Sequence, residues 1–271
     1  WEKTVSPGVR VLALDGGIRV NVAPANCTCL VENADRIQLE AVLERVSGET
    51  GVSLTAVYEG NTAKITAVGV QAHASTPDEG KNAITATLQV LCALPLAQGA
   101  AEKTVRQLHE IFPYGDNRGK ALGIAMEDAV SGCLTLTFSM VHLDSTGFWG
   151  VFDSRDPLCA TEENTCHVTE AKMAAFGWEC KGSLGPAHAV DGESDFIKVL
   201  LNAYETYTGR KGYCEAIGGG TYVHEIPGGV AFGAGEHDFD SHLHGANERA
   251  RISQLLKTAM IYALVISKLC A

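Results

Sequence analysis

Hydrophobic and polar residues alternate along residues 10–33, and this period of two predicts β-strands. Apolar residues recur at helical spacing over residues 36–48, which predicts a helix with one apolar stripe. Alternation returns over residues 52–70, where an acidic, glycine-containing turn predicts a hairpin. A second helix is predicted within residues 80–95, where Pro95 ends it. The order of elements predicts an α+β unit with helices on one face of an antiparallel sheet.

A second region repeats this order of elements without repeating its residues. Residues 102–112 predict a helix, and residues 132–157 predict a long hairpin. Another helix is expected at residues 166–176, followed by a short strand at residues 178–182. The pattern therefore indicates a second α+β unit, although no shared residue motif supports an internal repeat.

The composition changes near residues 182–195, where small, polar and proline residues predict a link between domains. Beyond it we expect a helix at residues 194–209, a glycine-rich segment and a short strand at residues 229–234. A final helix should carry one apolar stripe, made of Ile252, Leu255, Leu256, Ala259, Ala263 and Ile266. The alternation of strands and helices here favours an α/β layer.

Composition and charge narrow the classes of function. The 271 residues suffice for one large domain or two ordinary ones, and 46% are hydrophobic. A formal net charge of −11 argues against nucleic acid as a partner. We expect no membrane association, since the apolar runs fall short of the roughly 20 residues that span a bilayer. Nine scattered cysteines favour buried thiols in a reducing, cytoplasmic compartment.

The segment at residues 218–248 concentrates glycine, histidine and acidic residues. Its three consecutive glycines, Gly218–Gly220, allow backbone N–H groups to approach an anion, but a flexible turn explains them equally well. The loop from His237 to His244 offers imidazole and carboxylate groups, which are ligands of zinc and also common on surfaces. The spacing alone favours a solvated surface over a metal site.

Three residues outside this segment also suggest chemistry. His73 follows a predicted strand, where it could stabilise an oxyanion or simply cap a turn. Arg155 could hold a carboxylate ligand, or it could pair with neighbouring Asp153 or Asp156. Asn21 lies among apolar residues, where a buried amide would need partners from substrate or backbone.

In order along the chain, several motifs resemble those of zinc-dependent dipeptidases of the dipeptidase V and Xaa-His dipeptidase type. This type belongs to a group of co-catalytic zinc peptidases that includes aminoacylase and glutamate carboxypeptidase. The most specific matches are "HASTPDEGKNA" and the stretch running from "GGGTY" to "HGANE". "GGIRVNVAP" and "FDSRDP" add less specific support, and the matching segments span nearly the whole chain.

The resemblance implies a fold of mixed α/β and α+β class. Residues 15–190 would form a double α+β, ferredoxin-like lid domain, with halves at about 15–97 and 98–190. Residues 191–271 would be the C-terminal part of an α/β zinc-peptidase catalytic domain, and residues 1–14 a linker or remnant of it. The double lid implies a monomer, because the second half takes the place of a partner subunit.

The resemblance also implies roles for individual residues. His244 matches the last zinc ligand, and His73 matches the lid histidine that stabilises the oxyanion. Arg155 and Asn21 match residues that hold the C-terminal carboxylate of a dipeptide or short peptide. The same pocket would be lined by the backbone of Gly219, Gly220 and Thr221. His224 departs from the basic residue expected after "GGGTY", which suggests a changed substrate preference.

Most of the metal site expected for two zinc ions has no match in this sequence. The family's other ligands and its glutamate base lie upstream of the lid, and we read Glu162-Glu163 as surface. One histidine does not hold a catalytic zinc, so the chain resembles a fragment that is inactive alone. We expect the parent protein to be a dipeptidase. The alternatives are an N-acyl amino acid deacylase or carboxypeptidase of the same group, and a non-catalytic peptide-binding or assembly module.

Overall fold

The computed structural model describes residues 8–233, 238–239, 241 and 247–271. The chain divides into two compact units, which we call unit 1, Trp1–Gly185, and unit 2, Pro186–Ala271. Each unit is described by itself.

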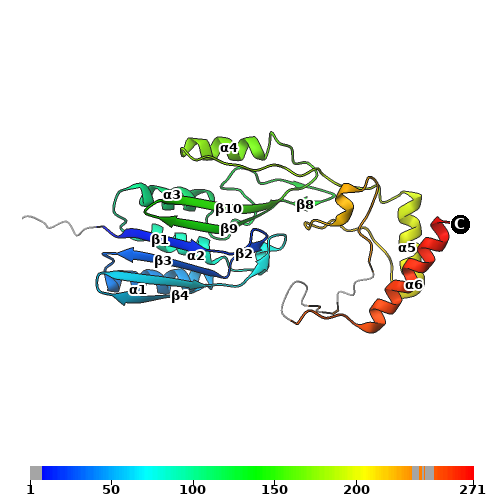
Figure 1. The fold of residues 1–271 in the computed structure, drawn as a ribbon, viewed down its shortest axis with the longest axis horizontal. Coiled ribbons are helices and arrows are strands. Elements are labelled where there is room, and N and C mark those ends of the chain that lie inside the picture. Colours follow the sequence, from blue (N-terminus) through cyan, green and yellow to red (C-terminus); the bar gives the residue numbers. More distant parts are fainter. Residues whose placement is uncertain (1–7, 234–237, 240, 242–246) are drawn as a thin grey trace, which may run out of the picture. The chain divides into compact units, whose positions relative to one another are not determined.

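Unit 1 is built on one antiparallel sheet of six strands, in the order β10-β9-β1-β3-β5-β4 (Figure 1). The strands are β1 (Arg10–Gly16), β3 (Asn26–Glu32), β4 (Ser53–Glu59), β5 (Thr62–Val68), β9 (Thr135–Asp144) and β10 (Gly147–Arg155). The hairpins β4–β5 and β9–β10 follow the predicted alternation. Leu14 of β1 pairs with Leu143 of β9, although residues 1–14 were predicted to be a linker or a remnant of the catalytic domain. Strand β1 thus lies between strands of the two predicted lid halves, β3 and β9, in one continuous sheet.

Helices pack on one face of this sheet, where they enclose the core. They are α1 (Arg36–Thr50), α2 (Ala83–Cys92) and α3 (Ala100–Ile111). Strand residues alternate accordingly: Ile65 is fully buried, whereas the neighbouring Lys64 is exposed. The Asp35 carboxylate accepts the Gln38 N–H at 2.8 Å and so caps α1. The mixed α/β class and the antiparallel sheet that the sequence predicts are confirmed.

Two short ladders and one further helix complete unit 1. Strand β2 (Val22–Ala23) pairs with β6 (Ala72–His73), which runs into the short helix η1 (Pro77–Glu79). Strand β7 (Glu127–Asp128) pairs with β8 (Gly132–Cys133). Helix α4 (Cys166–Ala175) follows the β9–β10 hairpin at the predicted place.

The prediction of strands at residues 178–182 and 229–234 is wrong for the residues that the structure describes. The N–H of Trp178 donates to the Met173 carbonyl at 3.0 Å and closes the end of α4, so it is not available to a β-ladder. Residues 229–233 have no partner strand in the described part of unit 2, and Phe232 instead packs against the helices. An apolar run without a neighbouring strand does not form a ladder.

Unit 2 contains α5 (Asp195–Thr208), the short helix η2 (Tyr222–Glu225) and α6 (Ile252–Leu269). Helices α5 and α6 bury a small cluster between them, made of Ile197, Leu200, Ala203, Ile261 and Val265. The predicted apolar stripe of α6 lies elsewhere, and all six of its residues are exposed. The described part of unit 2 therefore covers one narrow side of α6.

Helix α6 is also long and apolar enough to cross a membrane, a test that core helices of soluble proteins pass as well. The expectation that the protein has no membrane partner stays a prediction.

Candidate functional site

The β2–β6 ladder brings the segments of Asn21 and His73 together. His73 pairs with Val22 in register, and the Ala74 N–H donates to the Asn21 carbonyl at 3.0 Å. The Asn21 side chain is exposed and the residue lies in the turn before β2. The premise that Asn21 is buried is therefore wrong, and its amide is open to a ligand.

Thr135 connects this ladder to Arg155. In the β9–β10 hairpin Thr135 is the partner of Arg155, and both lie at the end of their strands. The Thr135 hydroxyl donates to the Ala74 carbonyl at 2.9 Å in a buried environment. One chain of contacts, from Asn21 through Ala74 and Thr135 to Arg155, thus brings three predicted site residues to one end of the sheet.

The hydrogen bonds of His73 fix which ring nitrogen carries its proton. Ser75 donates its backbone N–H to Nδ1 at 3.2 Å, and its hydroxyl lies 2.7 Å from the same atom. A ring nitrogen that accepts an N–H carries no proton of its own, so Nε2 is the ring nitrogen that carries one. His73 itself is half-buried.

Arg155 forms a two-point ion pair with Asp153. Nε donates to Oδ1 at 2.7 Å and Nη2 donates to Oδ2 at 2.9 Å. The two residues lie two apart on β10, where side chains point to the same face. Of the two salt-bridge partners considered from the sequence, Asp153 is thus the one in contact.

Asp156 has a different environment. Its Oδ2 accepts the Ser154 hydroxyl at 2.9 Å, while its Oδ1 is buried and has no hydrogen-bond partner in the described structure. Burial raises the pKa of this carboxyl above its usual value. Asp156 therefore neighbours Arg155 in sequence without bonding to it.

The remaining predicted site residues lie in the second part of the chain, and their roles stay predictions. Gly219, Gly220 and Thr221 belong to unit 2, where the Thr221 N–H donates to Nδ1 of His224 at 3.1 Å. His244 lies outside the described residues, as do His237 and His242.

Metal-binding side chains do not cluster in the part of the chain that the structure describes. No three His, Cys, Asp or Glu side chains there gather closely enough to hold a metal ion. Glu162 and Glu163 are exposed, as a surface pair would be. The described residues therefore do not fit a zinc centre.

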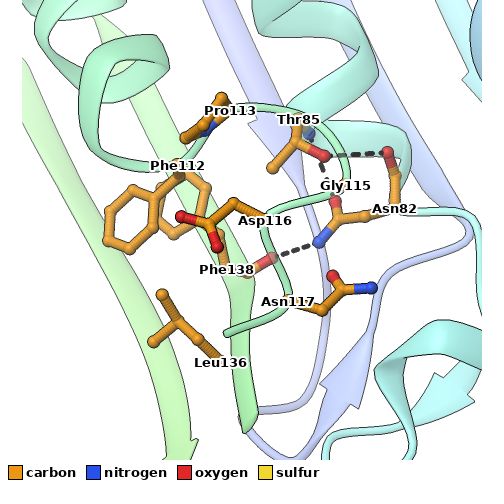
Figure 2. Close-up of a pocket in the computed structure, with 9 residues that line it drawn as sticks. All are labelled: Asn82, Thr85, Phe112, Pro113, Gly115, Asp116, Asn117, Leu136 and Phe138. Atoms are coloured by element: carbon orange, nitrogen blue, oxygen red, sulfur yellow. Dashed lines mark hydrogen bonds between the residues drawn. The ribbon is translucent and has the colours of Figure 1, made fainter. Parts of the chain in front are cut away.

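A small hollow lies elsewhere on unit 1, between the start of α2 and the loop after α3. Figure 2 shows its lining, which includes none of the predicted site residues. The Asn82 side chain is already bonded there: Nδ2 donates to the Phe138 carbonyl, and Oδ1 accepts the Ile84 N–H. Asp116 likewise accepts backbone N–H groups of its own loop. The polar groups of this hollow thus serve the fold.

Sequence reasoning missed Ser75 and Thr135, and it left open which neighbouring carboxylate pairs with Arg155. Ser75 follows His73 by two residues, a spacing at which a short side chain can reach back to the ring. Thr135 carried no local signal, because its partner Ala74 is far away in sequence and close only in the fold.

Comparison with known proteins shows which proteins this chain is similar to. Residues 57–143 match the M20 peptidase dimerisation domain. A putative dipeptidase of Staphylococcus epidermidis is 27% identical over 282 residues, covering 99% of this chain and 58% of the relative. A Beta-Ala-Xaa dipeptidase of Lactobacillus delbrueckii subsp. lactis is 28% identical over 254 residues, covering 93% of this chain and 54% of the relative. The chain thus spans a little over half the length of these relatives.

Among solved structures, the aminoacylhistidine dipeptidase of Vibrio alginolyticus matches with a TM-score of 0.41 and 13% identity. That match covers 95% of this chain and 63% of the other. The resemblance to dipeptidases is confirmed by the sequence relatives and by the M20 dimerisation domain. A domain described as a dimerisation domain argues against the monomer expected from the double lid.

Proposed function

We propose that this chain is part of a zinc-dependent dipeptidase, in which unit 1 is the lid that grips the substrate. The observation that carries the proposal is the convergence of Asn21, His73 and Arg155 through Ala74 and Thr135. The similarity to proteins named dipeptidases along nearly the whole chain supports it. The substrate would be a dipeptide or short peptide with a free C-terminal carboxylate.

Arg155 would bind that carboxylate. A guanidinium carries five N–H groups, and the side-on pair with Asp153 uses the Nε–H and one N–H of Nη2. The remaining N–H groups on Nη1 and Nη2 form the end-on fork that matches a carboxylate. The exposed amide of Asn21 would add a neutral donor beside it.

His73 would polarise the scissile carbonyl. Ser75 holds the ring by Nδ1, which leaves Nε2–H as the donor. A donor fixed before the reaction stabilises the negative charge that develops on the carbonyl oxygen without reorganising at that moment. Ser75 would therefore set the tautomer on which this function depends.

The resemblance assigns Gly219, Gly220 and Thr221 to the substrate pocket and His244 to zinc. The resemblance places the other ligands upstream of the lid, and the match covers 58% of the putative dipeptidase's length. Unit 2 would then be one part of a larger catalytic domain. The exposed apolar stripe of α6 supports that view, since such a stripe is normally covered in a complete domain.

A cytoplasmic location is supported by the nine cysteines, all of which are described and free. An enzyme acting on N-acyl amino acids would bind the substrate carboxylate through Arg155 as well. A variant of Arg155 therefore does not distinguish this alternative from a dipeptidase, whereas a comparison of the two substrates does.

The test is zinc content and dipeptide hydrolysis of the 271-residue chain, with binding measured in parallel. We expect no stoichiometric tight zinc and no turnover. We expect the chain to bind alanyl-alanine weakly. The Arg155→Ala variant should not bind this dipeptide, and the unchanged chain should not bind the C-terminal amide of the dipeptide. Tight zinc with turnover would show that the chain is catalytically complete, and equal binding of acid and amide would remove Arg155 from the account.

A further inference from the structure

The ion pair between Arg155 and Asp153 presents a problem for a carboxylate-binding site. Its two bonds, of 2.7 and 2.9 Å, place a negative charge directly against the group that should attract an anion. The side chains are 24% and 12% exposed, so solvent screens the pair only in part. On charge alone, Asp153 opposes the binding that we propose for Arg155.

We propose that Asp153 is a positioning residue, which fixes the guanidinium so that its end-on fork faces the substrate carboxylate. This inference rests on the proposed function of Arg155. The charge that Asp153 contributes weakens attraction for anions in general, while the orientation it imposes favours one planar, two-point geometry. Asp153 thus acts on specificity and pre-organisation rather than on the total attraction.

The placement of the pair on β10 supports this role. Asp153 and Arg155 point to the same face, and their partners on β9 are Thr137 and Thr135. Thr135 is hydrogen-bonded to Ala74, so the backbone beneath Arg155 is tied to the segment of His73. Fixing the guanidinium against this strand therefore also fixes it relative to His73.

The way in which Asp153 is bonded supports the same conclusion. Both of its carboxylate oxygens are bonded to Arg155, one to Nε and one to Nη2. An arginine side chain loses considerable rotamer freedom when it is held in one place. When a neighbouring carboxylate already holds the arginine side chain, the rotamer freedom is lost when the protein folds. Ligand binding then does not carry this entropic cost.

The two effects of Asp153 predict opposite results when its charge is removed. If charge dominates, Asp153→Asn leaves an unopposed guanidinium and tightens carboxylate binding. If positioning dominates, the same change weakens binding, because the asparagine amide cannot accept from both Nε and Nη2. The sign of the change in affinity therefore decides between them.

The experiment uses the 271-residue chain, labelled with ¹⁵N, and alanyl-alanine as the probe, with its C-terminal amide as the negative control. The Nε–H resonance of Arg155, assigned by its loss in Arg155→Ala, reports directly on the side-on pair. We expect this resonance to be slow to exchange with solvent in the wild type and in Asp153→Glu, and fast in Asp153→Asn. Alanyl-alanine affinity should fall about tenfold in Asp153→Asn, in keeping with the cost of ordering a flexible side chain.

Asp156→Asn is the matched control, because it removes a neighbouring acidic group that is not bonded to the guanidinium. It should keep the wild-type affinity and the slow Nε–H exchange. Asp153→Glu keeps the carboxylate and should recover part of the affinity. Asp153→Ser serves under the same criteria if the asparagine variant does not fold, as judged by tryptophan fluorescence.

Two failures can be told apart. Unchanged or tighter binding in Asp153→Asn, with binding still lost in Arg155→Ala, would overturn the positioning role and leave the proposed function standing. Binding that survives Arg155→Ala, or no carboxylate-dependent binding by the wild type, would overturn the carboxylate role of Arg155 and that of Asp153 with it.

Discussion

The hydrogen bond from Thr135 to Ala74 connects the segment of His73 to the strand pair that carries Arg155. Removing this bond tests whether it stabilises that arrangement. The change is Thr135→Val, which replaces the hydroxyl by a methyl group of similar size. The Ala74 carbonyl would then lose the donor that it has at 2.9 Å, in a place where Thr135 is 9% exposed and Ala74 fully buried. An unsatisfied buried acceptor costs about 1–3 kcal/mol of folding free energy.

The same strand provides a matched control. Thr137 lies two residues further along, is 2% exposed, and has a hydroxyl with no hydrogen-bond partner among the described residues. Thr137→Val removes a polar group that gains nothing in the folded state. It should therefore leave the free energy of unfolding unchanged or raise it slightly.

Urea unfolding followed by tryptophan fluorescence measures both changes. The described tryptophans, Trp149 and Trp178, belong to unit 1, so the signal reports on the unit that contains the bond. Thr135→Val should also lower Tm, by about 2–4 °C for each kcal/mol lost in a unit of this size. Equal stability of the two valine variants would show that the bond does not hold β6 to β9, and would refute the reasoning.

Three further predictions follow from local contacts. The hydrogen bond to Asp15 raises the pKa of His142 above 6.5, so Asp15→Asn should lower that pKa in an NMR titration. The folding stability that this bond contributes is fully present at pH values below the pKa of His142 in the unfolded chain. It is lost as the pH rises through the pKa of His142 in the folded protein. Asn82→Ala removes the cap of α2 and its bond to Phe138, and should cost about 1–3 kcal/mol in urea unfolding. Burial raises the pKa of the Cys27 thiol to about 12 and that of Cys29 well above its usual value, so alkylation at pH 8 with mass spectrometry should modify them only on unfolding. The exposed thiols should react in the folded state, namely Cys133, Cys159, Cys214 and Cys270.

The sequence predicted those parts of the fold that local periodicity encodes. The β4–β5 and β9–β10 hairpins and the helices of unit 1 lie where alternation and helical spacing place them. The joining of both halves in one sheet depends on the β1–β9 ladder, whose paired residues Leu14 and Leu143 are too distant in sequence for any local pattern to link. The apolar stripe of α6 was predicted from the sequence. Periodicity shows which residues share a helix face, but it does not show what packs against that face.

The candidate site divides in the same way. His73 and Arg155 stood out because of their residue type and motif, and the structure brings their segments together. The choice between Asp153 and Asp156 as the partner of Arg155 needed the strand geometry, since residues two apart on a strand share a face. Asn21 was misjudged as buried because its apolar neighbours suggested a strand interior, whereas it lies in a turn.

The claim that unit 1 grips a peptide by its C-terminal carboxylate is tested most directly by mapping backbone amide shifts on the ¹⁵N-labelled chain. On addition of alanyl-alanine, we expect the amides of Asn21, Ala74 and Arg155 to shift together and to saturate at one concentration. The C-terminal amide of the same peptide should leave all three in place. Shifts confined to the hollow around Asn117, or equal shifts with acid and amide, would contradict the account.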